Sequence, residues 1–182
     1  MNAPFRFAAA RVRLADPGDR PAMARFLAED PAATAFHRLE WIDAVECATG
    51  HRAHLLLAER DGAITAMLPL HAAHSPLFGR ALVSTGFAVG GGLIGDAGEA
   101  PALFDAAREL ARRLSTPSIE LRGGVMPEGA GWHIKQDSHA GFVLPLAADD
   151  EAQLLAVPRK QRAEVRKGLG NDLEVRVGRS EA

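Results

Sequence analysis

The dipeptide Asp61-Gly62 separates two apolar runs and constrains the fold more than any other feature of this chain. The first run reads His54-Leu-Leu-Leu-Ala-Glu-Arg60, and the second reads Ala63-Ile-Thr-Ala-Met-Leu-Pro-Leu70. Asp-Gly favours a two-residue type I′ turn, whose twist matches that of two antiparallel strands. We therefore predict a β-hairpin in which Arg60 pairs with Ala63.

An uninterrupted ladder in this register pairs Arg52 with His71. Pro69 has no N–H group, so it indicates a bulge or an edge position near that point of the outgoing strand. The register also brings His51, His54 and His71 to one end of the ladder, where a zinc site is geometrically conceivable. No cysteine or carboxylate accompanies them at ligand spacing, so we expect exposed histidines and no metal.

The remaining periodicities alternate between strand and helix. Helical spacing follows Asp19 through Leu27 and recurs at 36–50, 101–114, 150–156 and 158–170. Strand patterns occur at 5–14, 77–84, 118–122, 133–136, 141–146 and 172–177. This order predicts an α/β or α+β sheet with helices on its faces and an early antiparallel hairpin.

Composition excludes several classes of protein. A length of 182 residues suggests one domain or two small ones, and 47% hydrophobic residues suffice for a core. The net charge of −2 argues against a duplex nucleic acid binder, and the scarcity of aromatics, with no tyrosine, argues against a platform for base stacking. Cys47 is the single cysteine, so a reducing cytoplasm is expected. No apolar run approaches the length of a membrane span, and the N-terminal residues do not have the pattern of a secretory signal.

Five of the nine residues from Arg159 to Lys167 are basic. Pro158 can open a helix there, and the helical repeat places Arg159, Arg162 and Arg166 along one side, extended by Lys160 and Lys167. Two of these cations fall in the first turn, where the helix dipole disfavours positive charge and a bound anion would relieve the conflict. The stretch is therefore either an anion site or a solvated surface helix.

A glycine-rich loop, Gly86 to Gly95, contains the spacing G-x-G-x-x-G at Gly90, Gly92 and Gly95. The next helix does not open on the third glycine, so a dinucleotide pyrophosphate would lack its helix N-terminus. We expect instead a flexible or close-packed loop beside a ligand cleft.

Glu120 and Arg122 share one face of a short strand, either as a structural ion pair or as cleft groups. No Gly-x-Ser-x-Gly elbow or paired-carboxylate motif is present, and the catalytic residues stay unassigned.

Seven segments, taken in order and spacing, resemble the first half of FemAB-like proteins, especially the subgroup associated with exosortase (PEP-CTERM) and exopolysaccharide systems. The resemblance covers about residues 10–178 and rests on these segments: Phe36-His37…Trp41, Leu57-Ala58-Glu59-Arg60-Asp61-Gly62, Leu68-Pro69-Leu70, Leu77-Phe78-Gly79…Leu82-Val83-Ser84, Gly91-Gly92, Glu120-Leu121-Arg122 and Pro158-Arg159-Lys160-Gln161-Arg162…Arg166-Lys167.

The resemblance implies a GNAT-like acyltransferase fold, with a mixed, mostly antiparallel sheet flanked by helices. It implies an N-terminal GNAT-like domain over 1–156, with 157–182 beginning the junction to a second such domain. Members usually continue for another domain, so we expect this chain to be incomplete as a catalyst alone.

The implied substrate is a nucleotide-sugar or another anionic precursor of peptidoglycan or exopolysaccharide. The implied acyl donor is aminoacyl-tRNA or acyl-CoA, although the Arg/Gln-x-x-Gly-x-Gly/Ala pyrophosphate loop of acetyl-CoA enzymes is missing. The expected substrate-binding residues are Arg159, Lys160, Arg162, Arg166, His37 and Trp41. The alternative is a non-catalytic interaction module, whose basic helix docks an acidic partner, a second domain or another copy of the chain.

Overall fold

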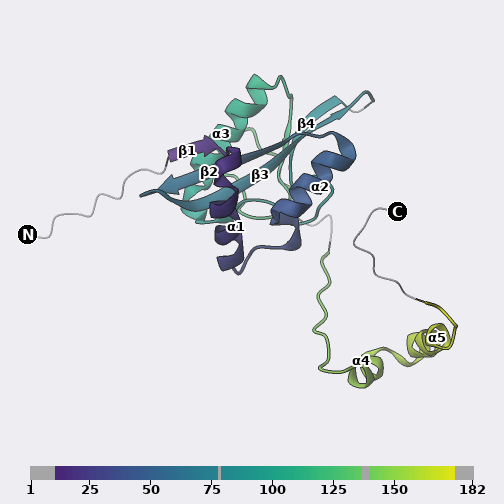
Figure 1. Ribbon diagram of the computed structural model, residues 1–182. Coiled ribbons are helices and arrows are strands. Elements are labelled where there is room, and N and C mark those ends of the chain that lie inside the picture. Colours follow the sequence, from purple (N-terminus) through teal and green to yellow (C-terminus); the bar gives the residue numbers. More distant parts are fainter. Residues whose placement is uncertain (1–10, 78, 137–139, 175–182) are drawn as a thin grey trace, which may run out of the picture. The chain divides into compact units, whose positions relative to one another are not determined.

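The computed structural model describes residues 11–77, 79–136 and 140–174, which belong to two compact units (Figure 1). Unit 1 spans Met1–Ile134 and unit 2 spans Lys135–Ala182. Unit 1 contains a sheet of order β1-β2-β3-β4-β6, with β5 paired to β3. Its strands are β1 (Arg11–Leu14), β2 (Ala53–Arg60), β3 (Ala63–Ser75), β4 (Gly79–Ser84), β5 (Ile94–Gly95) and β6 (Ile119–Glu120).

Three helices accompany this sheet: α1 (Arg20–Glu29), α2 (Leu39–Thr49) and α3 (Ala100–Arg113). Unit 2 contains α4 (Asp150–Ala156) and α5 (Arg159–Leu169). Every strand pairing in the described residues is antiparallel except that of β4 with β6. The predicted mixed, mostly antiparallel sheet flanked by helices is therefore confirmed.

The hairpin forms where Asp61-Gly62 predicted it. Asp61 has φ 52° and Gly62 has φ 80°, as a type I′ turn requires, and Arg60 pairs with Ala63. The Glu59–Ile64 pair also follows this register, but beyond it the prediction was wrong by one residue: Ala53, and not Arg52, pairs with His71. The cause is a bulge at Ala58/Glu59.

The bulged residue is Thr65. Ala58 pairs with Ala66 and Glu59 with Ile64, which leaves Thr65 without a partner across the ladder. The Thr65 hydroxyl donates to the Ala58 carbonyl at 3.2 Å, and the Thr65 carbonyl accepts from the Asp96 N–H at 2.9 Å. These two bonds give partners to the hydroxyl and the carbonyl of the bulged residue.

Pro69 lies inside the sheet, paired with Leu55. Its carbonyl accepts from the Thr85 N–H at 3.2 Å, so its nitrogen also faces the β4 side. On that side the β4 ladder ends at Leu70 and the β5 ladder begins at Met67. Proline is tolerated because its missing N–H falls in the gap between two partner strands.

The two faces of the sheet carry separate apolar clusters, because successive strand residues point to opposite sides. Leu68, Leu70 and Leu82 pack with Leu103 and Ala107 of α3. Alternate strand residues Leu57 and Met67 pack with α1 and α2 through Met23, Leu27, Leu39 and Ile42. Figure 1 shows α1 and α2 over one face of the sheet and α3 over the other.

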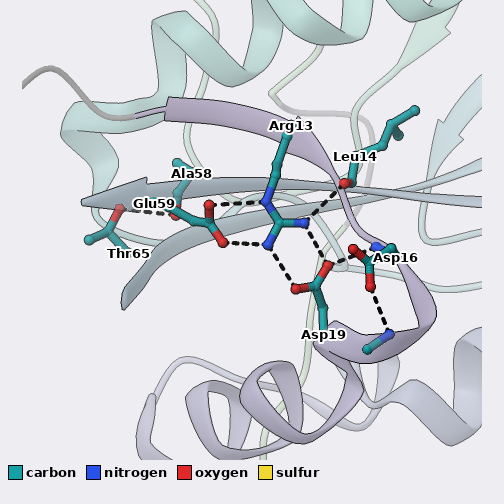
Figure 2. A network of polar contacts seen from close by, with 8 residues as sticks. Arg13, Leu14, Asp16, Asp19, Ala58, Glu59 and Thr65 are labelled. Carbon is teal, nitrogen blue, oxygen red and sulfur yellow. Dashed lines mark hydrogen bonds and ion pairs between the residues drawn. The ribbon is translucent and has the colours of Figure 1, made fainter. Parts of the chain in front are cut away.

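Arg13 connects β1, β2 and the turn before α1 (Figure 2). Its guanidinium donates from Nε to Glu59 at 3.0 Å and from Nη1 and Nη2 to Asp19 at 2.6 and 2.7 Å. Asp19 also accepts from the Asp16 N–H at 2.7 Å. The hydrogen bonds from Arg13 and Asp16 lower the pKa of Asp19 to about 2.

Arg13→Ala is expected to lower the melting temperature more than Arg20→Ala, because Arg13 joins two carboxylates and Arg20 pairs only with exposed Asp43. The folded pKa of Asp19 lies below its ordinary value of about 4. Its contribution is therefore complete above that pH and is lost as the pH falls through about 2. Melting curves from pH 7 to pH 2 should show the wild-type advantage over Arg13→Ala shrinking below pH 4; a constant advantage would contradict this assignment.

Some predicted strands were wrong. Residues 133–136 and 141–146 have no strand pairing in the described part of the chain, because an extended segment becomes a strand only with a neighbour to bond. Residues 172–174 form no strand either, and the rest of that prediction lies outside the described residues, as do residues 5–10 of the first strand. The helices of unit 2 were correct: Asp149 caps α4, and α5 begins after Pro158.

Candidate functional site at the carboxyl ends of the parallel strands

The candidate site lies where β4 and β6 end. These strands are parallel, with Leu82 opposite Ile119 and Val83 opposite Glu120, and α3 lies between them in the chain. Ligands of such sheets bind outside the carboxyl ends of parallel strands, where loops from both strands meet. Here β4 continues into residues 85–93, the glycine loop, and β6 continues into Gly123-Gly124.

The glycine loop packs backbone against backbone on Gly123-Gly124. A Cβ on Gly92 would overlap the Gly123 carbonyl oxygen, and one on Gly91 would overlap the Thr85 side chain. Gly124 has φ 73°, and a Cβ there would lie 2.8 Å from the Leu93 nitrogen. Of the two alternatives for this loop, the structure therefore supports the close-packed one. As predicted, α3 begins several residues after Gly95 and not on it.

Three buried or half-buried side chains hold the loop from the α2 side. Trp41 Nε1 donates to the Gly86 carbonyl at 3.3 Å, and His37 Nε2 lies 3.1 Å from the Gly92 carbonyl. His71 Nδ1 accepts from the Gly86 N–H at 3.0 Å. The predicted residues His37 and Trp41 thus meet at the site, where their polar atoms bond the loop backbone.

Sequence reasoning missed His71 as part of this site and considered it only for a metal. The signal was its position: His71 follows Met67 by four residues in β3, so it points to the face that α2 covers. Its side chain is 1% exposed. A histidine on a covered strand face must bond to the backbone around it.

The hydrogen bonds of both histidines that hold the loop require the neutral imidazole. The Thr34 N–H donates to His37 Nδ1 at 3.1 Å and the Gly86 N–H donates to His71 Nδ1, so each Nδ1 is an acceptor. The proton of each ring lies on Nε2, which faces the Gly92 carbonyl in His37 and the Ile42 carbonyl in His71. Burial lowers the pKa of both imidazoles and favours this form.

The N-terminus of α3 is occupied by the chain's own carboxylates. Asp96 accepts from the Gly98 N–H at 2.8 Å, and buried Glu99 forms an ion pair with Arg60. Asp96 caps the 3-10 turn 97–99 that leads into α3, and Glu99 is the residue before α3, so both negative charges lie near that helix end without bonding its N–H groups. A phosphate would meet two carboxylates there, and their negative charges disfavour a pyrophosphate at this helix end.

A cavity of about 570 Å³ lies beside this helix end, within unit 1. The Arg108 guanidinium stacks 4.9 Å over the Trp132 ring, and the Phe104 and Trp132 rings meet edge to face at 5.9 Å. Arg108 also pairs with Asp105 at 2.8 Å. The remaining lining residues are Ala97, Ala100, Pro101, Val125, Met126, Glu128 and Gly129. An apolar wall with a few charged groups suits a small organic ligand.

Glu120 and Arg122 form an ion pair of 2.7 Å at the end of β6. The Arg122 N–H also donates to the Ser84 hydroxyl at 2.7 Å, which ties the ends of β6 and β4 together. Of the two alternatives left open by the sequence, the structure shows the ion pair. Neither side chain is deeply buried, so Arg122 remains at the edge of the site.

The four predicted basic residues lie on α5 in unit 2, and their surroundings differ. Arg162 donates to the Leu155 and Val157 carbonyls at 2.7 and 3.0 Å, so it caps the end of α4. Arg159, Lys160 and Arg166 are exposed, and none of them forms an ion pair with another described residue. Three of the four predicted residues therefore keep an exposed charge with no ion pair among the described residues.

The described residues contain neither a metal-binding cluster nor a membrane-spanning helix. No set of three or more histidine, cysteine, aspartate or glutamate side chains gathers there in a way that could hold a metal ion. Among the helices of the same residues, none has the length and apolar character needed to cross a membrane.

Comparisons with known proteins found similarity only at the level of structure. No protein-family model matches the chain, and no curated protein does. A GNAT family acetyltransferase from Staphylococcus aureus aligns with TM-score 0.46 and 13% identity over 70% of this chain and 99% of its own. A ribosomal-protein-alanine N-acetyltransferase from Brucella melitensis aligns with TM-score 0.48 and 20% identity, covering 76% and 99%.

A predicted acetyltransferase with acetyl-CoA from Clostridium acetobutylicum gives TM-score 0.42 and 15% identity, covering 72% of this chain and 99% of its own. All three of these structural neighbours are acetyltransferases. None of the three is described as a FemAB-like protein.

Proposed function

We propose that this chain supplies the N-terminal GNAT-like domain of a FemAB-like N-acyltransferase or aminoacyltransferase. Its substrate is a precursor of the cell envelope or of an exopolysaccharide, and the chain is incomplete as a catalyst alone. The observation that carries the proposal is the β4–α3–β6 crossover, the one parallel pairing among the described strands, with a glycine loop at its carboxyl end. That arrangement brings loops together where a ligand can approach the backbone.

The surroundings of α3 bear on the donor. Asp96 and Glu99 place two negative charges near the helix end where a CoA pyrophosphate would gain most from the dipole. This favours aminoacyl-tRNA over acyl-CoA as the acyl donor. We assign contact with phosphate, from the donor or from a nucleotide-sugar, to the exposed cations Arg159, Lys160 and Arg166 of α5.

The test measures binding of anionic ligands to the whole chain by titration calorimetry at low salt. The ligands are a UDP-sugar, an aminoacyl-tRNA and acetyl-CoA. Replacing Arg159, Lys160 and Arg166 together with glutamine should weaken binding of the first two by about tenfold for each phosphate contact that is lost, because a charge-assisted bond contributes about 1.5 kcal/mol. Arg25→Gln, at an exposed arginine of α1, is the matched control and should leave affinity unchanged.

Equal affinity in the triple variant would overturn the α5 assignment. Binding of acetyl-CoA with the tightest affinity would overturn the choice of donor. Arg162 is left intact in this design because its bonds to Leu155 and Val157 hold α4 against α5, so its removal would change the structure of unit 2.

A second candidate function is the non-catalytic interaction module, and one observation favours it. Neither helix of unit 2 contains a buried residue, and Phe142 and Val143 are each 95% exposed. Further exposed apolar side chains of this unit are Leu144, Leu146, Leu155, Val165, Leu169 and Leu173. Such a surface is typical of protein interfaces. If the chain binds none of the three ligands but elutes in a stable complex with an acidic protein or with itself, this candidate replaces the first.

A further inference from the structure

His71 joins three parts of unit 1 through one imidazole ring. The ring starts from the middle strand β3, its Nε2 lies 3.4 Å from the Ile42 carbonyl of α2, and its Nδ1 accepts from the Gly86 N–H at 3.0 Å. Gly86 is buried directly against the ring, since a Cβ there would lie 3.3 Å from the His71 Cγ. The start of the glycine loop is therefore positioned by this side chain.

The bond to Gly86 requires the neutral ring. A proton on Nδ1 would face the proton of the Gly86 N–H, so the two groups could no longer approach to 3.0 Å. A flip of the ring would move Nε2 away from the Ile42 carbonyl, which would then lose its donor. Protonation therefore breaks the bond and leaves a cation in a site that is 1% exposed.

His37, at the other end of the loop, behaves differently. Its Nε2 faces the Gly92 carbonyl, and an Nε2–H bond to a carbonyl survives protonation of the ring. Protonation of its Nδ1 would break the bond from the Thr34 N–H, but the Thr34 hydroxyl 2.9 Å away can then accept, and neither group belongs to the glycine loop. The Gly86 end of the loop is thus the acid-sensitive end.

Few charged groups face these rings. Glu46 of α2 favours a cation at His71, whereas His51 disfavours one, and burial outweighs both and lowers the His71 pKa. The pKa of His54 in β2 is also lowered, chiefly by burial, and a positive charge on His71 lowers it further. Asp30 is the charged group that faces His37. The Glu46 carboxylate accepts from the Ala53 N–H at 3.0 Å and forms no ion pair with a described histidine.

We propose that His71 is a positioning residue that holds the Gly86 N–H of the glycine loop only while its imidazole is neutral, so that mild acid breaks this bond and leaves Gly86 held through the Trp41 bond to its carbonyl. The change concerns the loop backbone, because the Gly86 N–H then has no acceptor. This inference stands independently of the proposed acyltransferase function, since it concerns the loop and not a ligand.

The experiment follows the Gly86 amide by nitrogen-15 NMR in the whole chain between pH 7.5 and pH 5. Its protection factor against hydrogen exchange should fall by about tenfold or more, with a midpoint below the ordinary histidine value of about 6.5. His71→Asn is the matched variant, because its Oδ1 takes the position of Nδ1 and accepts the same bond without titrating. In this variant the protection factor should stay constant with pH. His71→Gln, whose amide corresponds to Nε2, should lose the protection at every pH.

Two results would overturn the proposal: a wild-type protection factor that does not change with pH, or a His71→Asn variant that changes as the wild type does. If His71→Asn does not fold, the tautomer of His71 in the wild type gives an independent answer. Long-range proton–nitrogen spectra at pH 7.5 should show Nδ1 unprotonated and Nε2 protonated. A proton on Nδ1 at that pH would directly contradict the proposed bond from the Gly86 N–H to His71.

Discussion

Gly92→Ala is expected to lower the free energy of unfolding of unit 1 by about 3 kcal/mol, since overpacking against fixed backbone is among the costlier single changes. The added methyl group would overlap the Gly123 carbonyl oxygen. That oxygen belongs to the backbone next to Gly124, where an added Cβ would lie only 2.8 Å from the Leu93 nitrogen. Neither side can move without separating the carboxyl ends of β4 and β6.

Gly90→Ala is the matched control for this change. Gly90 lies two residues away with φ 72°, and a Cβ there would meet open space. Only the left-handed backbone conformation is penalised, at about 1 kcal/mol. Urea unfolding followed by circular dichroism gives both values. Equal losses in the two variants would show that the glycine loop is not packed on Gly123-Gly124.

Local signals account for the parts of the fold that the sequence predicted. Asp61-Gly62 specified the hairpin turn, Pro158 specified the start of α5, and Gly50 specified the end of α2 with φ 69°. Each depends on backbone preferences of a few neighbouring residues. The bulge at Thr65 depends instead on bonds to Ala58 and Asp96, and a turn motif carries no information about them.

In the candidate site too, local sequence signals predicted some features, and contacts with distant residues decided the others. The glycine spacing predicted a close-packed loop as one of two alternatives, but its partner, Gly123-Gly124, lies about thirty residues later in the chain. His37 and Trp41 were expected as cleft walls, and they meet at the loop that borders the site. Helical spacing placed Arg162 on the basic side of α5, yet its guanidinium bonds to carbonyls of the preceding turn. Spacing defines a face of a helix and not the partner of a side chain.

The bonds of Arg162 to α4 also change which part of α5 could bind an anion. With Arg162 bound to α4, the remaining cations are Arg159 and Lys160 at the start of the helix and Arg166 and Lys167 near its end. An anion at the start would be favoured by the dipole, and the cations near the end are already favoured by it. The conflict that pointed to an anion site therefore remains only at the first turn.

The ion pair at the start of α3 should carry a similarly large energy. Arg60→Met is expected to lower the free energy of unfolding by about 3 kcal/mol, because it leaves the Glu99 carboxylate buried without a counter-charge. The Glu99 side chain is 6% exposed, whereas that of Arg60 is 31% exposed. The larger loss in the free energy of unfolding is therefore expected in the variant that keeps the buried Glu99 carboxylate.

A double-mutant cycle separates the pair from its surroundings. Adding Glu99→Gln to Arg60→Met removes the buried charge and should restore part of the lost stability. The matched control is Arg20→Met, whose partner Asp43 is 54% exposed, and it should cost at most about 1 kcal/mol. If Arg60→Met costs no more than this control, the carboxylate at α3 has access to water. A helix end open to water could accept an external phosphate, and the case against acyl-CoA as the donor would then fail.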